Sequence, residues 1–343
     1  EILMPMLHPK QNWLQTGGWD NIDVLFKVVS RTKKEYALGQ SHEEVVTPLA
    51  KEVILSYRDL PLALYQIHWK FRDELRAKSG ILRGREFEMK DMYSFHTTQE
   101  DFERFYEEVK QAYIRAYKHV GLTAKATEAS GGSFSQKISY EFMVLTDAGE
   151  DDIYYCSNCD YCVNQEIAQV KEGDDCPKCQ GSKLQLARAS EVGNVFDLGQ
   201  KYTKDFDLTY MDDEGTQHHP IMGCYGWGTT RTMGVIVEKY NDEKGITWPR
   251  TVAPFDAILI NINLDPAEAE KIYQTLTNQG LDVLWDDRED ESIGSKFADA
   301  DLLGIPYRLV ISKKTGSQVE IKKRTENKEK MVDLSQIEEI ICL

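Results

Sequence analysis

One short stretch of the sequence, residues 71–96, concentrates side chains that could hold a nucleotide. It reads FRDELRAKSGILRGREFEMKDMYSFH and mixes guanidinium groups with carboxylates on both sides of Gly80. If both halves are strands, alternate side chains share one face. The first half would then present Arg72, Glu74 and Arg76, and the second half Arg83, Arg85, Phe87, Met89 and Asp91. Guanidinium forks, an aromatic ring and carboxylates on one surface suit a triphosphate, its base and its metal; the alternative is a solvated hairpin crossed by ion pairs.

Four cysteines have the spacing of a metal site. The segment CSNC (156–159) is followed after sixteen residues by CPKC (176–179), and in a zinc ribbon each such turn offers two thiolates to one tetrahedral ion. Four thiolates close the coordination shell, so we expect a structural Zn²⁺ without a catalytic role; four free thiols are the alternative. The expected ligands are Cys156, Cys159, Cys176 and Cys179. Of the other cysteines, Cys162 is either a replacement ligand or a spare, and Cys224 and Cys342 are expected to be buried.

The first part of the chain, which must position these groups, is predicted to contain both strands and helices. A strand is expected at residues 2–4; because the chain opens there without a methionine, further residues are expected upstream. Thr98-Gln-Glu-Asp101 predicts the start of a helix that buries an apolar stripe and ends at Gly121. The stripe consists of Phe102, Phe105, Tyr106, Val109, Tyr113 and Tyr117. The cysteine segment at about 150–182, a strand-rich stretch over 188–220 and a helix over 233–240 follow.

The segment 241–254, rich in glycine, proline and charge, predicts a domain boundary near residue 249. Beyond it, DAILININ (256–263) reads as a buried strand, and Asp265 and Pro266 start a helix that ends at Gly280. Strands separated by helices then predict an α/β domain over 250–343 with a mostly parallel sheet.

The composition is that of a folded protein, with 41% hydrophobic and 10% aromatic residues. A net charge of −16 argues against a protein that coats nucleic acid non-specifically, although recognition of one folded RNA remains compatible with it. Basic residues gather at 313–330, as a solvated loop or as an RNA contact. No apolar run approaches the roughly 20 residues of a membrane helix, and nothing resembles a signal peptide, so a cytoplasmic protein without membrane contact is expected.

Several sequence strings, taken in order, resemble the class II aminoacyl-tRNA synthetases. FRDE with RGREF is similar to their motif 2, GCYGWGTTR (223–231) to motif 3 and EILMPML (1–7) to the end of motif 1. Over essentially the whole chain the strings resemble bacterial-type prolyl-tRNA synthetases. They are LHPKQNW, LGQSHEE, YRDLPLALYQIHWKFRDE, REFEMKDMYSFH, SGGSFS, EVGNVFDLGQKY and DDR with GSKFADADLLGIP. The fold class implied is an α+β catalytic domain over 1–249 with an antiparallel sheet, a zinc-ribbon insert at 150–182 and an α/β anticodon-binding domain over 250–343.

This resemblance implies ATP-dependent activation of proline and transfer of the prolyl group to tRNA(Pro), with Mg²⁺ as cofactor and a homodimer as the assembly. By motif position, Arg72 bridges the α-phosphate and the proline carboxylate, and Glu74 lies near the adenine amino group. Arg83 reaches the γ-phosphate. Phe87 and Arg231 enclose the adenine, and Arg231 also touches the γ-phosphate. Glu191 is a magnesium or ribose contact; a framework ion pair is the alternative.

For proline, the resemblance implies a site built from a hydroxyl, a carboxylate and close backbone. Ser41 and Glu43 stand where relatives carry Thr and Glu, whereas His42 is expected to be structural. Gly131 and Gly132 of SGGSFS, with Gly226 and Gly228 of motif 3, would let backbone approach the ligand.

The sequence also departs from the family pattern. Tyr140 replaces a usual histidine, which puts one pocket contact in doubt, and Trp227 replaces a small aliphatic residue, which would narrow the site. Only about a hundred residues separate motifs 2 and 3, so the large editing insertion of many bacterial members is expected to be missing. We therefore expect measurable activation of alanine, left uncorrected in cis.

In the C-terminal domain, Asp286, Asp287 and Arg288 follow a strand end, where they could contact anticodon guanines or simply supply solubilising charge. Two other functions are alternatives. One is a synthetase paralogue with a non-tRNA acceptor, and the other is a zinc-ribbon nucleic-acid-binding module. Proline-dependent exchange of pyrophosphate into ATP separates the three.

Overall fold

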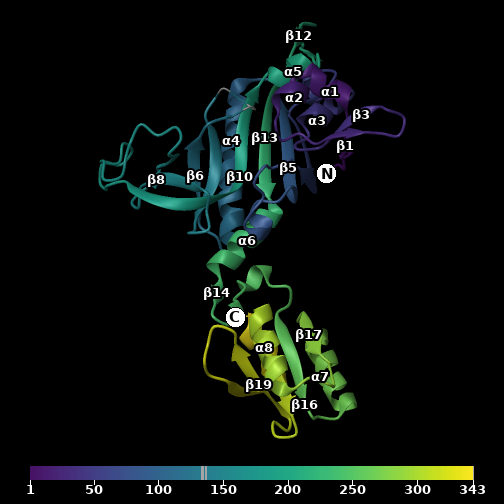
Figure 1. The fold of residues 1–343 in the computed structure, drawn as a ribbon, viewed down its shortest axis with the longest axis vertical. Coiled ribbons are helices and arrows are strands. Elements are labelled where there is room, and N and C mark those ends of the chain that lie inside the picture. Colours follow the sequence, from purple (N-terminus) through teal and green to yellow (C-terminus); the bar gives the residue numbers. More distant parts are fainter. Residues whose placement is uncertain (133–134, 136, 343) are drawn as a thin grey trace. The chain divides into compact units, whose positions relative to one another are not determined.

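The computed structural model describes residues 1–132, 135 and 137–342 and divides the chain into two compact units (Figure 1). Unit 1 comprises residues 1–118 and 122–235, and unit 2 comprises residues 119–121 together with the chain from Ile236 onward. Within the described residues, no helix combines the length and apolarity needed to cross a membrane.

Unit 1 opens with a small antiparallel sheet and three helices. The strands β1 (Leu7–Pro9), β2 (Lys27–Val29) and β3 (Glu35–Leu38) pair in the order β1-β3-β2, and the helices are α1 (Lys10–Gln15), α2 (Gly18–Asn21) and α3 (Glu43–Lys51). Two acidic residues occupy the first turn of α3, where the helix dipole favours negative charge. The strand expected at residues 2–4 is wrong: this segment has no regular structure, and Ile2 only donates its N–H to the carbonyl of Tyr65 at 2.9 Å.

An eight-stranded sheet forms the body of unit 1, in the order β4-β5-β13-β10-β7-β6-β9-β8. Neighbouring strands are antiparallel except for β6 and β9. The strands are β4 (Leu62–Phe71), β5 (Glu86–His96), β6 (Ala124–Ala129), β7 (Ser139–Leu145), β8 (Asp151–Tyr155), β9 (Cys162–Asn164), β10 (Gln185–Gly199) and β13 (Ile221–Gly228). The short elements α5 (Lys201–Asp205), β11 (Tyr210–Met211) and β12 (Gln217–His218) lie between β10 and β13 in the chain.

The long helix α4 (Gln99–His119) covers one face of this sheet. It starts as predicted: the Asp101 N–H donates to Thr98 Oγ1 at 3.2 Å. Its buried aromatic residues meet the sheet, since the Tyr113 ring lies 5.1 Å from Phe142 on β7 and the Tyr117 ring 4.3 Å from Trp227 on β13. Because side chains alternate along a strand, the neighbours of Phe142 and Trp227 point to the opposite face.

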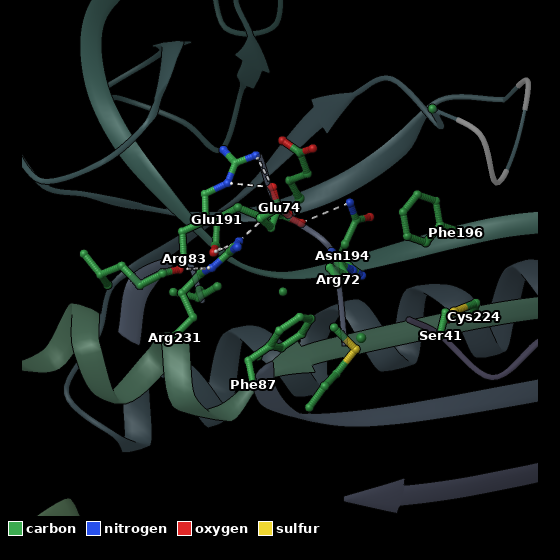
Figure 2. A pocket seen from close by; sticks show the side chains of 18 of the residues that line it. Ser41, Arg72, Glu74, Arg83, Phe87, Glu191, Asn194, Phe196, Cys224 and Arg231 are labelled. Atoms are coloured by element: carbon green, nitrogen blue, oxygen red, sulfur yellow. Dashed lines mark hydrogen bonds and ion pairs between the residues drawn. The ribbon is translucent and has the colours of Figure 1, made fainter. Parts of the chain in front are cut away.

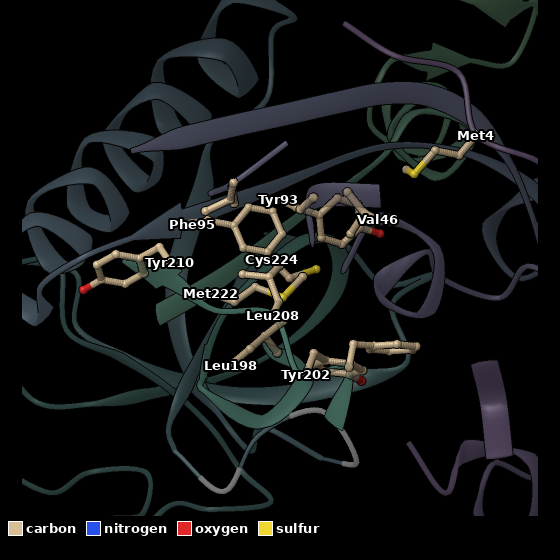
Figure 3. Close-up of a cluster of buried hydrophobic side chains, with 13 residues drawn as sticks. Met4, Val46, Tyr93, Phe95, Leu198, Tyr202, Leu208, Tyr210, Met222 and Cys224 are labelled. Carbon is tan, nitrogen blue, oxygen red and sulfur yellow. The ribbon is translucent and has the colours of Figure 1, made fainter. Parts of the chain in front are cut away.

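A hydrophobic core links the sheet to α3 and α5 (Figure 3). Val46 from α3 and Tyr202 from α5 pack with Tyr93 and Phe95 of β5 and Met222 of β13. This core fixes the start of α3 beside β5 and β13, and so places residues 41–43 next to the sheet.

Unit 2 contains a five-stranded sheet in the order β17-β16-β18-β19-β20. Its elements are β14 (Asn241–Asp242), β15 (Gly245–Ile246), β16 (Ala257–Ile262), α7 (Pro266–Asn278), β17 (Val283–Asp286), α8 (Ile293–Leu303), β18 (Tyr307–Ser312), β19 (Gln318–Lys323), β20 (Lys330–Asp333) and α9 (Ile337–Cys342). The predicted cap of α7 is confirmed, since Asp265 accepts from the Ala267 N–H at 2.9 Å. The mostly parallel sheet is a wrong prediction: β16 is parallel to β17 and β18, but β19 and β20 are antiparallel. The strand β20 was not predicted from the sequence.

Unit 2 begins ahead of the boundary expected near residue 249. The β14–β15 hairpin belongs to it, and Arg324, after β19, forms two hydrogen bonds of 2.6 and 2.7 Å with the Asp242 carboxylate. This ion pair holds part of the segment in which the domain boundary was expected.

Asp286 at the end of β17 is not available to an anticodon in this structure. Its side chain is buried and accepts from Arg288 at 2.8 and 2.9 Å, and the Lys296 ammonium lies 3.6 Å away. The Arg288 guanidinium, the first cause, lowers the pKa of Asp286. Asp286 is therefore a framework residue, and not an anticodon contact or a solubilising charge.

Cys342, expected to be buried, is exposed.

Candidate active site

A pocket of about 370 Å³ lies on the face of the large sheet opposite α4. It is walled by β5, β7, β10 and β13, by the chain after β4 and by the start of α6 (Thr229–Lys239). All twelve residues expected at the ATP or proline site line it. They are Ser41, Glu43, Arg72, Glu74, Arg83, Phe87, Gly131, Gly132, Glu191, Gly226, Gly228 and Arg231. Of the glycine-bearing string SGGSFS, positions 133 and 134 lie outside the described residues.

The charged residues of the segment 71–96 that line this pocket lie outside the strands, not on the strand face that alternation predicted. β4 ends at Phe71, so Arg72 and Glu74 lie in irregular chain, and Arg83 precedes β5. Arg76, placed with Arg72 by alternation, is exposed and does not line the pocket. Within β5 the alternation holds for Phe87 and Met89, which both line the pocket.

One end of the pocket combines an aromatic ring with guanidinium groups. Arg72 lies over the Phe87 ring, with Cζ 5.1 Å from the ring centroid. Arg231 donates from Nε to the carbonyl of Leu82 at 2.9 Å, and from Nη1 to the Glu191 backbone oxygen at 3.0 Å and to Glu191 Oε2 at 3.2 Å. Figure 2 shows Arg83, Arg231, Glu74 and Glu191 gathered at this end, with Arg72 and Asn194 between them and the opposite end.

A β-bulge brings Glu191 into the site. The pairing of β10 with β7 shifts register between Glu191 and Gly193, so one extra residue re-aims the side chains on either side. Glu191 therefore lines the same pocket as Asn194 and Phe196, three and five residues further along. Asn194 Nδ2 donates to Glu191 Oε1 at 3.4 Å.

Arg83 is held by two carboxylates in this structure. Its guanidinium bonds Glu74 Oε2 at 2.8 and 3.2 Å and Glu150 Oε2 at 2.7 Å. Both hydrogen bonds, with Glu74 first, raise the pKa of Arg83. To reach a γ-phosphate, Arg83 would exchange one of these partners for phosphate oxygen.

The opposite end of the pocket carries a buried carboxylate. Glu43, at the start of α3, is fully buried, and its Oε1 accepts from the Cys224 thiol at 2.9 Å. Burial is the main cause that raises the pKa of Glu43. Behind Glu43, the buried Lys70 ammonium lies 2.8 Å from Asp91 Oδ1, and His42 is buried and shows no contact with the pocket, as expected of a structural residue.

Two buried atoms at this site lack a hydrogen-bond partner among the described residues. Arg72 Nε is a donor without an acceptor, and Glu43 Oε2 is an acceptor without a donor. Leaving either unpaired in a dry site is costly. A bound zwitterion would complement both, because its carboxylate accepts and its ammonium donates.

The glycines keep parts of the pocket wall free of side chains. Gly226 lies between Asn194 and Asp91 in the cross-strand register, and a Cβ there would come within 3.3 Å of Met89 Sδ. Gly132 has a φ of +53°, which disfavours other residues.

The two family departures do not act on this pocket. Trp227 faces α4, packs on Tyr117 and donates from Nε1 to Thr232 Oγ1 at 2.8 Å. Tyr140 lies under the Lys110 ammonium of α4, 3.9 Å from the ring centroid. The expectation that Trp227 narrows the site is therefore wrong, because its side chain points to the helix-covered face. Tyr140 points to the same face and does not line the pocket, in line with the doubt about a contact at this position.

Several lining residues were not singled out from the sequence. Glu141, Glu166, Asn194 and Phe196 are the main ones. Asn194 and Phe196 occur in the string EVGNVFDLGQKY that carries the family resemblance, and Glu141 follows Tyr140. Only the strand register shows which of these positions face the pocket.

The four cysteines 156, 159, 176 and 179 come together, with their sulfur atoms all within 4.8 Å of one another. Cys156 Sγ lies 3.6 Å from Cys179 Sγ, and Cys159 Sγ 3.6 Å from Cys176 Sγ. Zn–S bonds of about 2.3 Å in a tetrahedron place sulfurs slightly under 4 Å apart, so this set fits Zn²⁺. Cys162 lies outside the set, where its sulfur accepts from Thr127 Oγ1 at 3.1 Å.

Comparison with known proteins agrees with the fold. The family model described as the tRNA synthetase class II core domain (G, H, P, S and T) matches residues 26–240, and an anticodon binding domain matches residues 256–342. A crystal structure of the prolyl-tRNA synthetase from Cryptosporidium parvum, complexed with L-proline and AMP, superposes with a TM-score of 0.78. It is 20% identical and covers 99% of this chain, which spans 64% of that longer chain; at this identity the likeness establishes the fold. The two units thus define a class II aminoacyl-tRNA synthetase.

Curated relatives narrow the class. A proline--tRNA ligase of Wolbachia sp. subsp. Brugia malayi is 38% identical over 99% of this chain and 83% of its own length, and that of Anaplasma marginale is 39% identical over 91% and 76%. The chain belongs to the proline--tRNA ligase family of class II synthetases. The enzyme of Aquifex aeolicus is 32% identical over 479 aligned residues, covering 94% of this chain and 84% of the relative. That alignment is longer than the 343 residues of this chain, so the relative carries segments that this chain lacks.

Proposed function

We propose that the pocket of unit 1 activates proline with ATP and transfers the prolyl group to tRNA(Pro). The observation that carries the proposal is the place of Arg72. It lies over Phe87 at the nucleotide end, and its unpaired Nε is buried between that end and Glu43. A guanidinium in this place can bind the α-phosphate and the proline carboxylate at once.

In the first step, a carboxylate oxygen of proline attacks the α-phosphorus, and the bond from that phosphorus to the bridging oxygen of pyrophosphate breaks. Arg72 neutralises the charge at both reacting groups, while Phe87 and Arg231 hold the adenine and Glu74 lies near its amino group. Arg83 and Arg231 reach the γ-phosphate. No covalent bond to the protein forms, so positioning and electrostatics supply the catalysis. In the second step, a hydroxyl of the terminal tRNA ribose attacks the prolyl carbonyl and AMP leaves.

Mg²⁺ would supply further positive charge at the phosphates when bound. Glu191 is the residue proposed to contact it or the ribose, because its carboxylate lines the pocket beside Arg231. Oxygen ligands are the ones that Mg²⁺ prefers.

Proline is proposed to bind at the Glu43 end. Glu43 Oε2, without a partner among the described residues, would accept from the protonated ring nitrogen. Ser41 supplies a hydroxyl, and Gly132 and Gly226 leave room for the ring.

The rest of the chain is assigned supporting roles. Unit 2 is proposed to bind the anticodon of tRNA(Pro), in line with its family match, and the four cysteines to hold a structural Zn²⁺. A homodimer in the cytoplasm is the proposed state. On the edge strand β4, Tyr65, Ile67 and Trp69 are exposed by 37%, 50% and 43%, and an apolar row of this kind marks an association surface.

Proline-dependent exchange of pyrophosphate into ATP tests the proposal, followed by charging of tRNA(Pro). We expect exchange with proline and transfer to the tRNA. Exchange with serine, threonine or glycine but not proline would overturn the substrate, and exchange without charging would favour a paralogue with another acceptor.

A further inference from the structure

The cysteine-bearing insert is continuous with the sheet that carries the active site. Its returning strand β9 pairs antiparallel with β8, where Ile153 opposes Asn164, and meets β6 in parallel between Val163 and Glu128. The CSNC turn joins β8 to β9. The end of β9 therefore has a fixed register relative to the pocket strands.

Asn164, at this end of β9, uses both ends of its amide. Its Oδ1 accepts from the Glu166 N–H at 3.0 Å, and its Nδ2 donates to Glu141 Oε2 at 3.1 Å. The backbone contact fixes which side of the amide is oxygen, so the nitrogen must face Glu141. Asn164 is only 7% exposed, while Glu141 and Glu166 line the pocket.

Glu141 lies in one cross-strand row with Asn194 and Gly226. Among the described residues, no donor is hydrogen-bonded to its other oxygen, Oε1, which leaves that atom available to a ligand. A nucleotide bound at Phe87 and Arg72 would place its ribose against another wall of the same pocket, and Glu141 on β7 and Asn194 on β10 line that pocket. Ribose hydroxyls are donors, and carboxylates are acceptors.

Negative charges close to Glu141 disfavour its ionised form, and a fixed hydrogen-bond donor counteracts them. Glu191 on β10, Asp151 on β8 and Glu166 after β9 place negative charge near it, and the guanidinium of Arg231 on α6 is bonded to Glu191. Burial first, and then the charge of Glu191, raise the pKa of Glu141 to about 8, while the hydrogen bond from Asn164 opposes this rise. Asn164 thus favours the charged acceptor form of Glu141.

We propose that Asn164 is a positioning residue of the synthetic site, holding the Glu141 carboxylate so that it accepts hydrogen bonds from the ribose hydroxyls of the bound nucleotide. This inference rests on the proposed ATP site. It gives the insert a second role besides stability, as one wall of the nucleotide pocket.

The test measures pyrophosphate exchange by Asn164→Ala and Glu141→Gln, with ATP and with 2′,3′-dideoxy-ATP. For each variant we expect roughly a tenfold rise in KM for ATP, the size of one hydrogen bond to a charged group. KM for proline should stay unchanged, and the dideoxy nucleotide should show little difference from the parent enzyme. The double variant should be no worse than either single one, because both changes remove one interaction.

The matched control is Gln165→Ala. Gln165 is the next residue and also uses its amide, donating to the Tyr154 hydroxyl at 3.1 Å, but it does not line the pocket. It should keep the parent KM for ATP. If the insert acts only through stability, Asn164→Ala would impair both nucleotides equally, and this outcome overturns the inference, as would parent-like kinetics of both variants. Absence of proline-dependent exchange in the parent enzyme would instead overturn the proposed function.

Discussion

The guanidinium of Arg72 lies over the ring of Phe87, with 5.1 Å between Cζ and the ring centroid. This contact places the guanidinium beside the ring in the pocket where the nucleotide base and its α-phosphate are proposed to bind. Burial, the main cause, lowers the pKa of Arg72, and the charge of Glu191 opposes this effect. Little water surrounds this guanidinium, so its replacement should have a large effect on the rate of the reaction.

Replacing Arg72 by lysine should reduce kcat/KM for proline-dependent pyrophosphate exchange about a hundredfold. The change keeps one charge but loses the fork that spans two oxyanions, and such a loss in a dry site costs about 3 kcal/mol of transition-state stabilisation. Arg58→Lys, at an exposed position outside the pocket, should leave the exchange unchanged. An Arg72→Lys enzyme with the parent rate would contradict the role of Arg72.

Replacing Glu191 by glutamine should raise the Mg²⁺ concentration needed for half-maximal exchange. The amide keeps the size of the side chain, and Arg231 retains the backbone oxygen of residue 191 and the carbonyl of Leu82 as acceptors. Glu86→Gln, at an exposed position, serves as the control. A parent-like Mg²⁺ titration of the Glu191 variant would show that this carboxylate is only a partner of Arg231.

Alanine should support measurable pyrophosphate exchange. It lacks two ring methylenes of proline, worth roughly 0.8 kcal/mol each, and a pocket of this kind discriminates by about 1 to 3 kcal/mol. We therefore expect kcat/KM for alanine to lie roughly 10- to 200-fold below that for proline, and alanyl-tRNA to persist because no cis editing is expected. Trp227 faces α4 rather than the pocket, so it does not restrict the site. An enzyme with no detectable alanine activation would refute this prediction.

Loss of the metal site should destabilise the insert. Cys176→Ser removes one of four thiolates whose sulfurs lie within 4.8 Å, and metal-binding free energy contributes to folding. We expect lower zinc content by elemental analysis and a lower Tm. Cys342→Ser, at an exposed cysteine outside the cluster, should change neither quantity. A Cys176 variant with the parent Tm would mean that the thiols do not hold a structural ion.

Acid should destabilise unit 1 through His8. Burial, the largest cause, lowers the pKa of His8 to about 4, and its ring donates from Nε2 to the Pro5 carbonyl at 3.0 Å. An unfolded histidine titrates near 6.5, so between pH 6.5 and about 4 the unfolded chain binds more protons. The free energy of unfolding should therefore be highest above pH 6.5 and fall by up to ~3 kcal/mol across this window.

The check is the pH dependence of the free energy of unfolding in His8→Gln, whose amide can still donate to Pro5. The slope between pH 6.5 and 4 should decrease in this variant. An unchanged slope in the His8 variant would contradict the assignment.

Short sequence patterns predicted many of the residues of the site. Arg72, Phe87, Glu191 and Arg231 were chosen from motif strings, and the structure places them around one pocket. The CxxC spacing likewise predicted the four-sulfur cluster, and the stripe of α4 predicted its buried face. Each of these residues stands in a short string whose members are a few residues apart, so the sequence alone identifies it.

Other features required the tertiary structure, because they depend on where strands end and how they pair. Because β4 ends at Phe71, Arg72 and Glu74 do not lie on a strand face, and the bulge in β10 directs Glu191 to the pocket. Packing of α4 on one face of the sheet decided that Trp227 and Tyr140 point away from the pocket. Likewise, only long-range pairing brought Asn164 of the insert to Glu141, 23 residues earlier in the chain. Residue types set the available chemistry, whereas strand register and helix packing decided which side chains share the site.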